Sequence, residues 1–209
     1  MKKLLFFVVI SFYYSCALHN KPVKENDNEL TQTEKDIIDA FLDAELDKER
    51  YYRFKNYKYV VIKEALKKIK SIDTYLYSLD EWNSMNKINK SEDVKNMYFL
   101  DSLQIKRIKN NLKDEEVYHW EKTDFSNIKV KLLKFEELRK STNNGRYLKN
   151  NLIIFLSRPL LIDKNNALLS FDIGNGDMGN YSITHFTVLM QKVDEIWAQR
   201  YYYEDGVFY

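Results

Sequence analysis

Three residues of the types found together in hydrolytic active sites occur near the C-terminus: Ser170, Asp172 and His185. In a nucleophile–base–orienter site the hydroxyl attacks, the imidazole takes its proton and the carboxylate orients the imidazole. Ser170 is not surrounded by a Gly-x-Ser-x-Gly motif, so it lacks the sharp turn that exposes the nucleophile in α/β-hydrolases. These residues are candidate catalytic residues, and the alternative is that they are ordinary polar residues of a sheet.

Strand alternation places these residues on one face of a predicted sheet. Successive side chains of a strand point to opposite faces. If the apolar sides face the helices, the other face carries seven residues: Ser170, Asp172, His185, Thr187, Arg200, Tyr202 and Glu204. We predict that this face is the solvated side of an antiparallel sheet, because such sheets normally alternate in this way. A catalytic face is the less favoured interpretation.

A second candidate site is the loop 172–180, which contains three of the five glycines of the chain. The side-chain oxygens of Asn175, Asp177 and Asn180 are of the type that binds a hard cation. The spacing does not fit an EF-hand, and no Gly-Lys-Ser/Thr follows that would make a phosphate loop. The alternative is a long hairpin connection with positive φ at its glycines. We predict Asn175, Asp177, Asn180 and Tyr202 as binding residues.

The aromatic residues at the C-terminus divide into two expected groups. Large aromatic side chains are more often buried than exposed, so we expect Trp197, Tyr201 and Tyr203 in the core. A contact surface is then expected at Tyr202, Phe208 and Tyr209.

Metal and cofactor binding is not indicated by the composition. The chain has three histidines, His19, His119 and His185, and its single cysteine is Cys16. This is a poor supply for a His/Cys zinc site, so we expect no metal and no cofactor.

The first sixteen residues have the organisation of a secretory signal. Lys2 and Lys3 precede an apolar stretch over 4–12, and the small residue Ser15 precedes Cys16. The apolar stretch is shorter than the roughly 20 residues that cross a bilayer. An ordinary cleaved signal followed by a coincidental cysteine is the alternative to a lipid-attachment site.

A small residue directly before a cysteine resembles the lipobox of bacterial lipoproteins. This resemblance implies that 1–15 is removed, that the sulfur of Cys16 carries a diacylglycerol and that 16–30 is a flexible tether. Ala17 follows Cys16 in place of the aspartate of an inner-membrane retention signal, which favours the outer membrane. The expected location is therefore the cell envelope, with the chain attached through acyl chains.

Composition limits the class of partner. Without 1–15 the chain has 194 residues, within the range of one domain, and its formal charge falls from +2 to 0 because Lys2 and Lys3 are lost. A neutral chain gives no reason to expect nucleic acid as a partner. The expected partners are the membrane and an envelope protein.

The order of the predicted elements indicates an α+β fold of N-terminal helices packed on a C-terminal antiparallel meander, in one domain over 31–209. Thr31 and Glu34 form a capping box before a helix whose apolar residues recur at helical spacing. Further helices are predicted over 57–75 and 102–112. Strands are predicted by alternation or by β-branched residues, over 128–132, 152–156, 167–173, 186–190 and 196–203.

The C-terminal part resembles a pattern of small exported proteins of Bacteroidota-type bacteria, most of them uncharacterised. The resemblance is carried by 157–160, by 167–171, by the glycine-rich loop and by 193–197. It implies an exported α+β protein and brings no known activity. We therefore expect a non-enzymatic envelope lipoprotein that binds a ligand or a partner. The alternatives are a hydrolase that uses His185 and Asp172, and an immunity or inhibitor protein.

Overall fold

The computed structural model describes residues 29–85 and 96–206. The predicted signal segment 1–15, Cys16, nearly all of the tether 16–30, and the residues Phe208 and Tyr209 lie outside the described residues.

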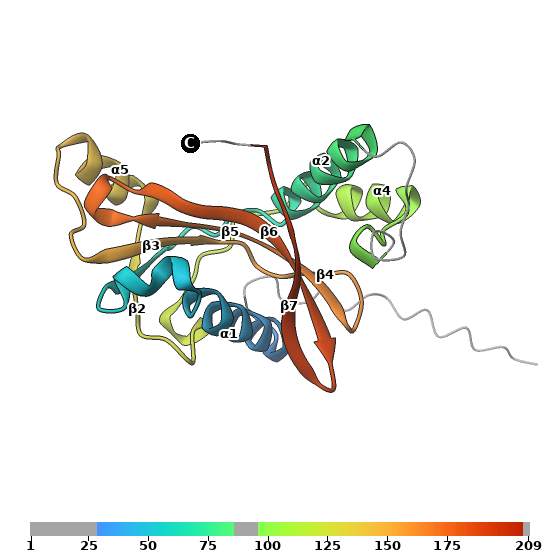
Figure 1. The fold of residues 1–209 in the computed structure, drawn as a ribbon, viewed down its shortest axis with the longest axis horizontal. Coiled ribbons are helices and arrows are strands. Elements are labelled where there is room, and N and C mark those ends of the chain that lie inside the picture. The colour runs from blue at the N-terminus through green and yellow to red at the C-terminus, as the bar shows by residue number, and fades with distance from the viewer. Residues whose placement is uncertain (1–28, 86–95, 207–209) are drawn as a thin grey trace, which may run out of the picture.

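The described residues form an α+β fold around one seven-stranded sheet, mostly antiparallel in its C-terminal part. Figure 1 shows α1 on one side of the sheet and α2 and α4 on the other. The helices are α1 (Gln32–Leu46), α2 (Ile69–Met85), α4 (Ser102–Asn111) and α5 (Phe135–Asn143), with 3-10 turns η1 (Glu49–Phe54), η2 (Lys122–Asp124) and η3 (Gly176–Met178). The strands are β1 (Lys58–Ile62), β2 (Val130–Leu133), β3 (Asn151–Leu156), β4 (Leu160–Leu161), β5 (Asn166–Asn175), β6 (Tyr181–Val193) and β7 (Ile196–Tyr203).

The strand order is β2-β1-β3-β5-β6-β7, and β4 pairs with β5 beside this path. The predicted antiparallel meander is confirmed for β3, β5, β6 and β7. It does not extend to β1, which pairs in parallel with both β2 and β3.

The first predicted helix is confirmed, together with the reason for its start. The hydroxyl of Thr31 accepts a hydrogen bond from the Glu34 N–H (3.2 Å), and the Glu34 carboxylate accepts one from the Thr31 N–H (2.9 Å). Ile37, Ile38 and Phe41 are fully buried against the sheet, as their helical spacing predicts.

The helix predicted over 57–75 is wrong. Residues 58–62 form the central strand β1, and α2 begins only at Ile69. Val60, Val61 and Ile62 are buried on both faces of the sheet, and a strand that is buried on both faces shows a continuous apolar run without alternation. Such a run does not separate a strand from a buried helix.

Both faces of the sheet are covered. On one face, α1 packs against alternate residues of the strands, such as Ile154, Leu169 and Val188. On the other face, α2 and α4 cover the end that contains Leu168, Leu189 and Tyr203. On this same second face, α5 covers the other end of the sheet, where β1 and β3 lie.

The prediction of a solvated face is therefore wrong for Ser170 and Thr187, whereas Arg200 and Glu204 are exposed. Ser170 and Thr187 lie on the face that α2 covers, and both are fully buried. Their polarity does not require solvent, because their hydroxyls bond to each other (2.6 Å) and the Ser170 hydroxyl also bonds to that of Ser71 on α2 (2.8 Å).

A register shift in β7 changes which side its residues face. Leu189 pairs with Tyr201 and Met190 pairs with Gln199, so Arg200 is the extra residue of a bulge. Trp197 and Tyr202 consequently lie on the α1 side, whereas Tyr203 lies on the α2 side. The burial expected of Trp197 and Tyr203 is confirmed, and Tyr201 is partly buried against the α2-side cluster. Tyr202, expected on an exposed contact surface, is half-buried, and its hydroxyl donates a hydrogen bond to Glu45 (2.9 Å).

Candidate functional site

The first candidate catalytic residue, Ser170, has the environment of a structural hydroxyl. Its Oγ lies between those of Ser71 and Thr187, and its N–H donates to Ser157 Oγ (2.9 Å). The side chain is fully buried, so no substrate reaches the oxygen without displacement of α2.

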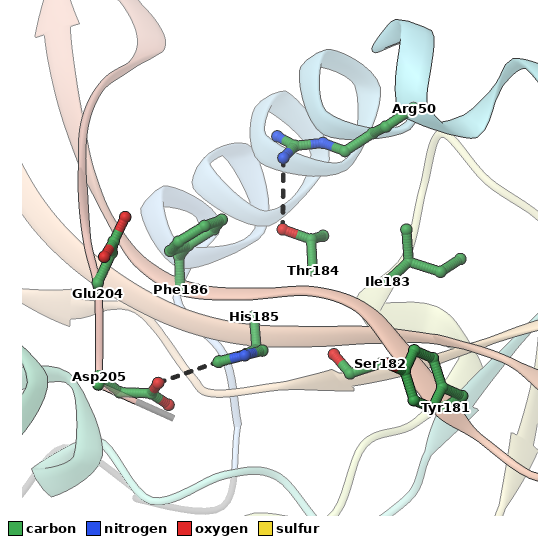
Figure 2. Close-up of a pocket in the computed structure, with 10 residues that line it drawn as sticks. Arg50, Tyr181, Ser182, Ile183, Thr184, His185, Phe186, Glu204 and Asp205 are labelled. Atoms are coloured by element: carbon green, nitrogen blue, oxygen red, sulfur yellow. Dashed lines mark hydrogen bonds and ion pairs between the residues drawn. The ribbon is translucent and has the colours of Figure 1, made fainter. Parts of the chain in front are cut away.

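Asp172 and His185 are brought together as cross-strand partners of β5 and β6. The Asp172 carboxylate accepts a hydrogen bond from the Ser182 hydroxyl (2.7 Å). His185 Nδ1 lies 3.1 Å from Asp205 Oδ1, and Lys70 Nζ lies 3.8 Å from the other oxygen of Asp205 (Figure 2). The chain after β7 thus contributes a carboxylate to His185.

His185 borders a surface cavity of about 450 Å³. The cavity lies where β7 leaves the first half of β6, and Figure 2 shows Arg50 above it and Glu204 and Asp205 at its other side. Arg50 contacts Thr184 Oγ1 (3.4 Å) and the buried carboxylate of Glu45 (3.0 Å). We call this hollow the β6 cavity; it is lined by Arg50, Tyr181, Ser182, Ile183, Thr184, His185, Phe186, Glu204, Asp205 and Gly206.

We expect Asp172→Asn to stabilise the protein more at pH 7 than at pH 4. Burial raises the pKa of Asp172, and it outweighs the opposing effects of the Ser182 hydroxyl and of His185. A carboxyl whose pKa is higher in the folded state binds more protons when folded, so stability falls as the pH rises from about 4 through the folded-state pKa. The neutral amide removes this loss. Urea unfolding at pH 4 and pH 7 measures the free energy of unfolding of both proteins. An equal increase in Asp172→Asn at the two pH values would contradict the expectation.

The predicted binding residues of the glycine-rich loop make bonds within the loop and to its neighbours. Asp177 accepts hydrogen bonds from the Tyr57 hydroxyl and from the Asn150 N–H (2.6 Å), and these bonds hold the pKa of Asp177 below its usual range. Asn175 Oδ1 accepts a bond from the Asp177 N–H (3.0 Å). Asn180 has a positive φ of 70°, and its buried Oδ1 has no hydrogen-bond partner among the described residues.

The glycines of this loop have packing roles. A Cβ at Gly176 would lie 2.4 Å from the carbonyl oxygen of Leu148, so only glycine allows this approach of two backbones. Gly179 has a φ of 71°. The loop is thus the hairpin connection between β5 and β6, and the side-chain oxygens of Asn175 and Asp177 hold its shape.

The fourth predicted binding residue, Tyr202, belongs to a buried ionic group that we call the Glu45 cluster. Glu45 is fully buried, and its carboxylate contacts Lys48 (2.6 Å), Arg50 (3.0 Å) and the hydroxyls of Tyr51 (3.1 Å) and Tyr202 (2.9 Å). Burial, and secondly the Glu45 charge, raise the pKa of both tyrosines. Neither hydroxyl is therefore disposed to ionise.

Asp205, Arg50 and Glu45 are the residues that sequence reasoning missed. Glu45 lies near the end of α1 among charged residues, a setting that is typical of a solvated side chain. One signal was present: Glu45 stands seven residues after Ile38 and four after Phe41, on the apolar side of the helix.

The described residues, 29–85 and 96–206, lack two features. They contain no group of three or more His, Cys, Asp or Glu side chains placed to hold a metal ion. They also contain no helix long and apolar enough to cross a membrane.

Comparison with known proteins adds no assignment to this geometry. No family profile, no curated protein and no solved structure matches the chain.

Proposed function

We propose that this chain is an exported, lipid-anchored protein that binds a partner protein at the β6 cavity and catalyses no reaction. The observation that supports binding is the cavity itself, a concave surface with exposed polar and aromatic side chains. The hydroxyl of Ser170, in contrast, is fully buried and bonded within the domain. Export and anchoring are supported by the signal-like segment that ends at Cys16.

The charges around the β6 cavity favour a basic group on the partner. Arg50, the cation at one side, lies 3.0 Å from the buried Glu45 carboxylate, which offsets part of its charge and is shared with Lys48. At the other side, Glu204 is exposed next to Phe186 (Figure 2). A lysine or arginine side chain of the partner fits between the Glu204 carboxylate and the aromatic ring.

Site-specific crosslinking tests this assignment. Tyr181, 51% exposed at the cavity, is replaced by p-benzoylphenylalanine, and Phe135, 50% exposed at the start of α5, is the matched control. In intact cells we expect one crosslinked protein from position 181 and none from position 135, and we expect Glu204→Lys to weaken that product severalfold. Equal products from both positions, or none from 181, would refute binding at the cavity.

The anchor is tested on the native N-terminus. Mass spectrometry is expected to find a chain that begins at Cys16 and carries acyl groups, and Cys16→Ser is expected to release the protein from membranes. A chain that begins at Met1 with an unmodified Cys16 would refute the anchor.

A hydrolase is the second candidate, and one observation favours it. His185 borders the cavity and lies 3.1 Å from Asp205, which has the geometry of a general base and its orienting carboxylate. In this candidate Asp205 takes the orienting role that sequence reasoning gave to Asp172. A hydrolytic activity of the purified protein that falls at least a hundredfold in His185→Ala would replace the binding proposal with this one.

A further inference from the structure

Two neighbouring turns at one end of the sheet carry exposed aliphatic side chains. Val193 and Ile196 are directly paired beside the β6–β7 turn, and they are 40% and 70% exposed. Leu161 on β4 is 42% exposed. The Lys192 N–H donates to the Asn165 carbonyl (2.8 Å), so the β4–β5 and β6–β7 turns lie side by side. By strand register, Val193 and Ile196 lie on the α2 side of the sheet and Leu161 lies on the α1 side, so both faces of this end carry exposed aliphatic side chains. We call Leu161, Val193 and Ile196 the aliphatic end of the domain.

The β6–β7 turn holds its aliphatic pair in a defined position. Asp194 and Glu195 both have positive φ, 50° and 64°, as a two-residue type I′ hairpin turn requires. Such a turn matches the twist of the flanking strands, so Val193 and Ile196 are presented on a rigid hairpin. A rigid hairpin that holds two exposed aliphatic side chains side by side is a candidate contact surface.

The described chain begins beside the same end. The helix α1 runs along β7, and Figure 1 shows its first residues near the part of β7 that follows the turn. Arg158, two residues before β4, bonds the Glu34 carboxylate in the first turn of α1 (2.9 Å) and the carbonyl of Glu29 (3.4 Å). A lipid attached before Glu29 therefore pulls this end of the domain toward the membrane.

We propose that the aliphatic end rests on the surface of the bilayer that holds the Cys16 anchor, with its side chains at the boundary of headgroups and acyl chains. This inference rests on the anchor in the proposed function. Fourteen residues lie between Cys16 and Thr31. Even a fully extended chain of this length spans only about 50 Å. The anchor thus keeps the domain within reach of the bilayer.

The charges of the two turns specify the kind of membrane contact. The two turns carry Lys164 and Lys192 against Asp163, Asp194 and Glu195, and Lys192 is paired with Glu195 (2.5 Å). Charges this nearly balanced supply little attraction to anionic lipid, so burial of the aliphatic side chains is the driving term. The contact is expected on zwitterionic lipid and is expected to change little between low and high salt.

The test places a fluorophore at the aliphatic end of the tethered protein. Residues 1–16 are replaced by a hexahistidine tag, and residues 17–209 are bound to phosphatidylcholine vesicles that contain a nickel-chelating lipid. Cys16 is the only cysteine, so Ile196→Cys carries a unique NBD label. Met178→Cys is the matched control: it is 62% exposed in the β5–β6 connection, at the other end of the 13-residue strand β6.

We expect emission from position 196 to shift to the blue, to rise at least twofold on tethering and to be quenched by lipids brominated in their acyl chains. Position 178 is expected to show none of these changes. In a third protein, a label at Leu161→Cys is expected to lose at least half of its quenching when Val193 and Ile196 are both changed to Ser.

Equal, unquenched emission at 196 and 178 would overturn the proposal. So would a blue shift at 196 that appears without vesicles at raised protein concentration, because the occupant would then be a second copy of the chain. Because the chelating lipid supplies the tether, these outcomes do not depend on native lipidation, and failure of the Cys16 anchor is detected separately by mass spectrometry.

Discussion

Glu45→Ala is expected to lower the free energy of unfolding by about 3–5 kcal/mol, the range measured when one partner of a buried ion pair is removed. The Glu45 carboxylate is fully buried and is the common acceptor for Lys48, Arg50, Tyr51 and Tyr202. Without it, two tyrosine hydroxyls and the side chains of Lys48 and Arg50, which are 30% and 35% exposed, lose their shared partner. Urea unfolding followed by circular dichroism measures the loss.

Glu49→Ala is the control for this prediction. Glu49 has the same side chain, lies four residues later and is exposed, so its removal is expected to change stability by less than about 0.5 kcal/mol. Similar losses of unfolding free energy in the two variants would show that the Glu45 cluster stabilises the protein no more than an exposed carboxylate does. Crosslinking from Tyr181 in Glu45→Ala then measures whether Arg50, released from Glu45, still supports the cavity.

Arg158→Ala has the second-largest expected effect, a loss of about 3 kcal/mol. The Arg158 guanidinium forms a two-bond contact with the Glu34 carboxylate (3.0 and 2.9 Å), and both side chains are nearly buried. Its removal leaves Glu34 buried without its cation. The loss is expected at the lower end of the range because Glu34 keeps its hydrogen bond from the Thr31 N–H.

Arg139→Ala is the matched control for Arg158. Two nitrogens of Arg139 likewise donate to one carboxylate, that of Glu136. This pair, however, is exposed and lies within a single helix. Its removal is expected to leave the unfolding midpoint unchanged within error. Arg158 lies between β3 and β4 and donates a hydrogen bond to the Glu29 carbonyl. Arg158→Ala is therefore also expected to speed amide exchange at the start of α1. Unchanged exchange there would contradict the role of Arg158 in holding the first described residues.

The elements predicted correctly are those whose signals are local. The start of α1 follows from the side chains of Thr31 and Glu34, which are three residues apart. The helix predicted over 102–112 is observed as α4, with Asp101 and Gln104 as its capping box. Strand alternation in β5 and β6 and the turn at Asp194 and Glu195 likewise depend only on neighbours along the chain.

The errors occur where partners distant in sequence determine the outcome. Val60 and Val61 fit helical spacing, and only pairing with β2 and β3 makes them a central strand. The alternation around Ser170 predicts a wet face, but α2 covers this face, and Ser71, ninety-nine residues earlier, bonds the Ser170 hydroxyl together with Thr187. Tyr202 changes faces because of a one-residue bulge at Arg200, which moves every later side chain of β7 to the opposite side.

The sequence by itself determined the α+β class, the helix start at Thr31 and the periodic apolar faces, because these depend on propensity, capping and spacing over a few residues. Only the tertiary structure decided that both faces of the sheet are covered, that His185 pairs with Asp205 and that Glu45 is buried under two cations. Those outcomes depend on which distant segments pack together. A local sequence pattern fits a buried, hydrogen-bonded hydroxyl as well as a solvated one, so it does not distinguish between them.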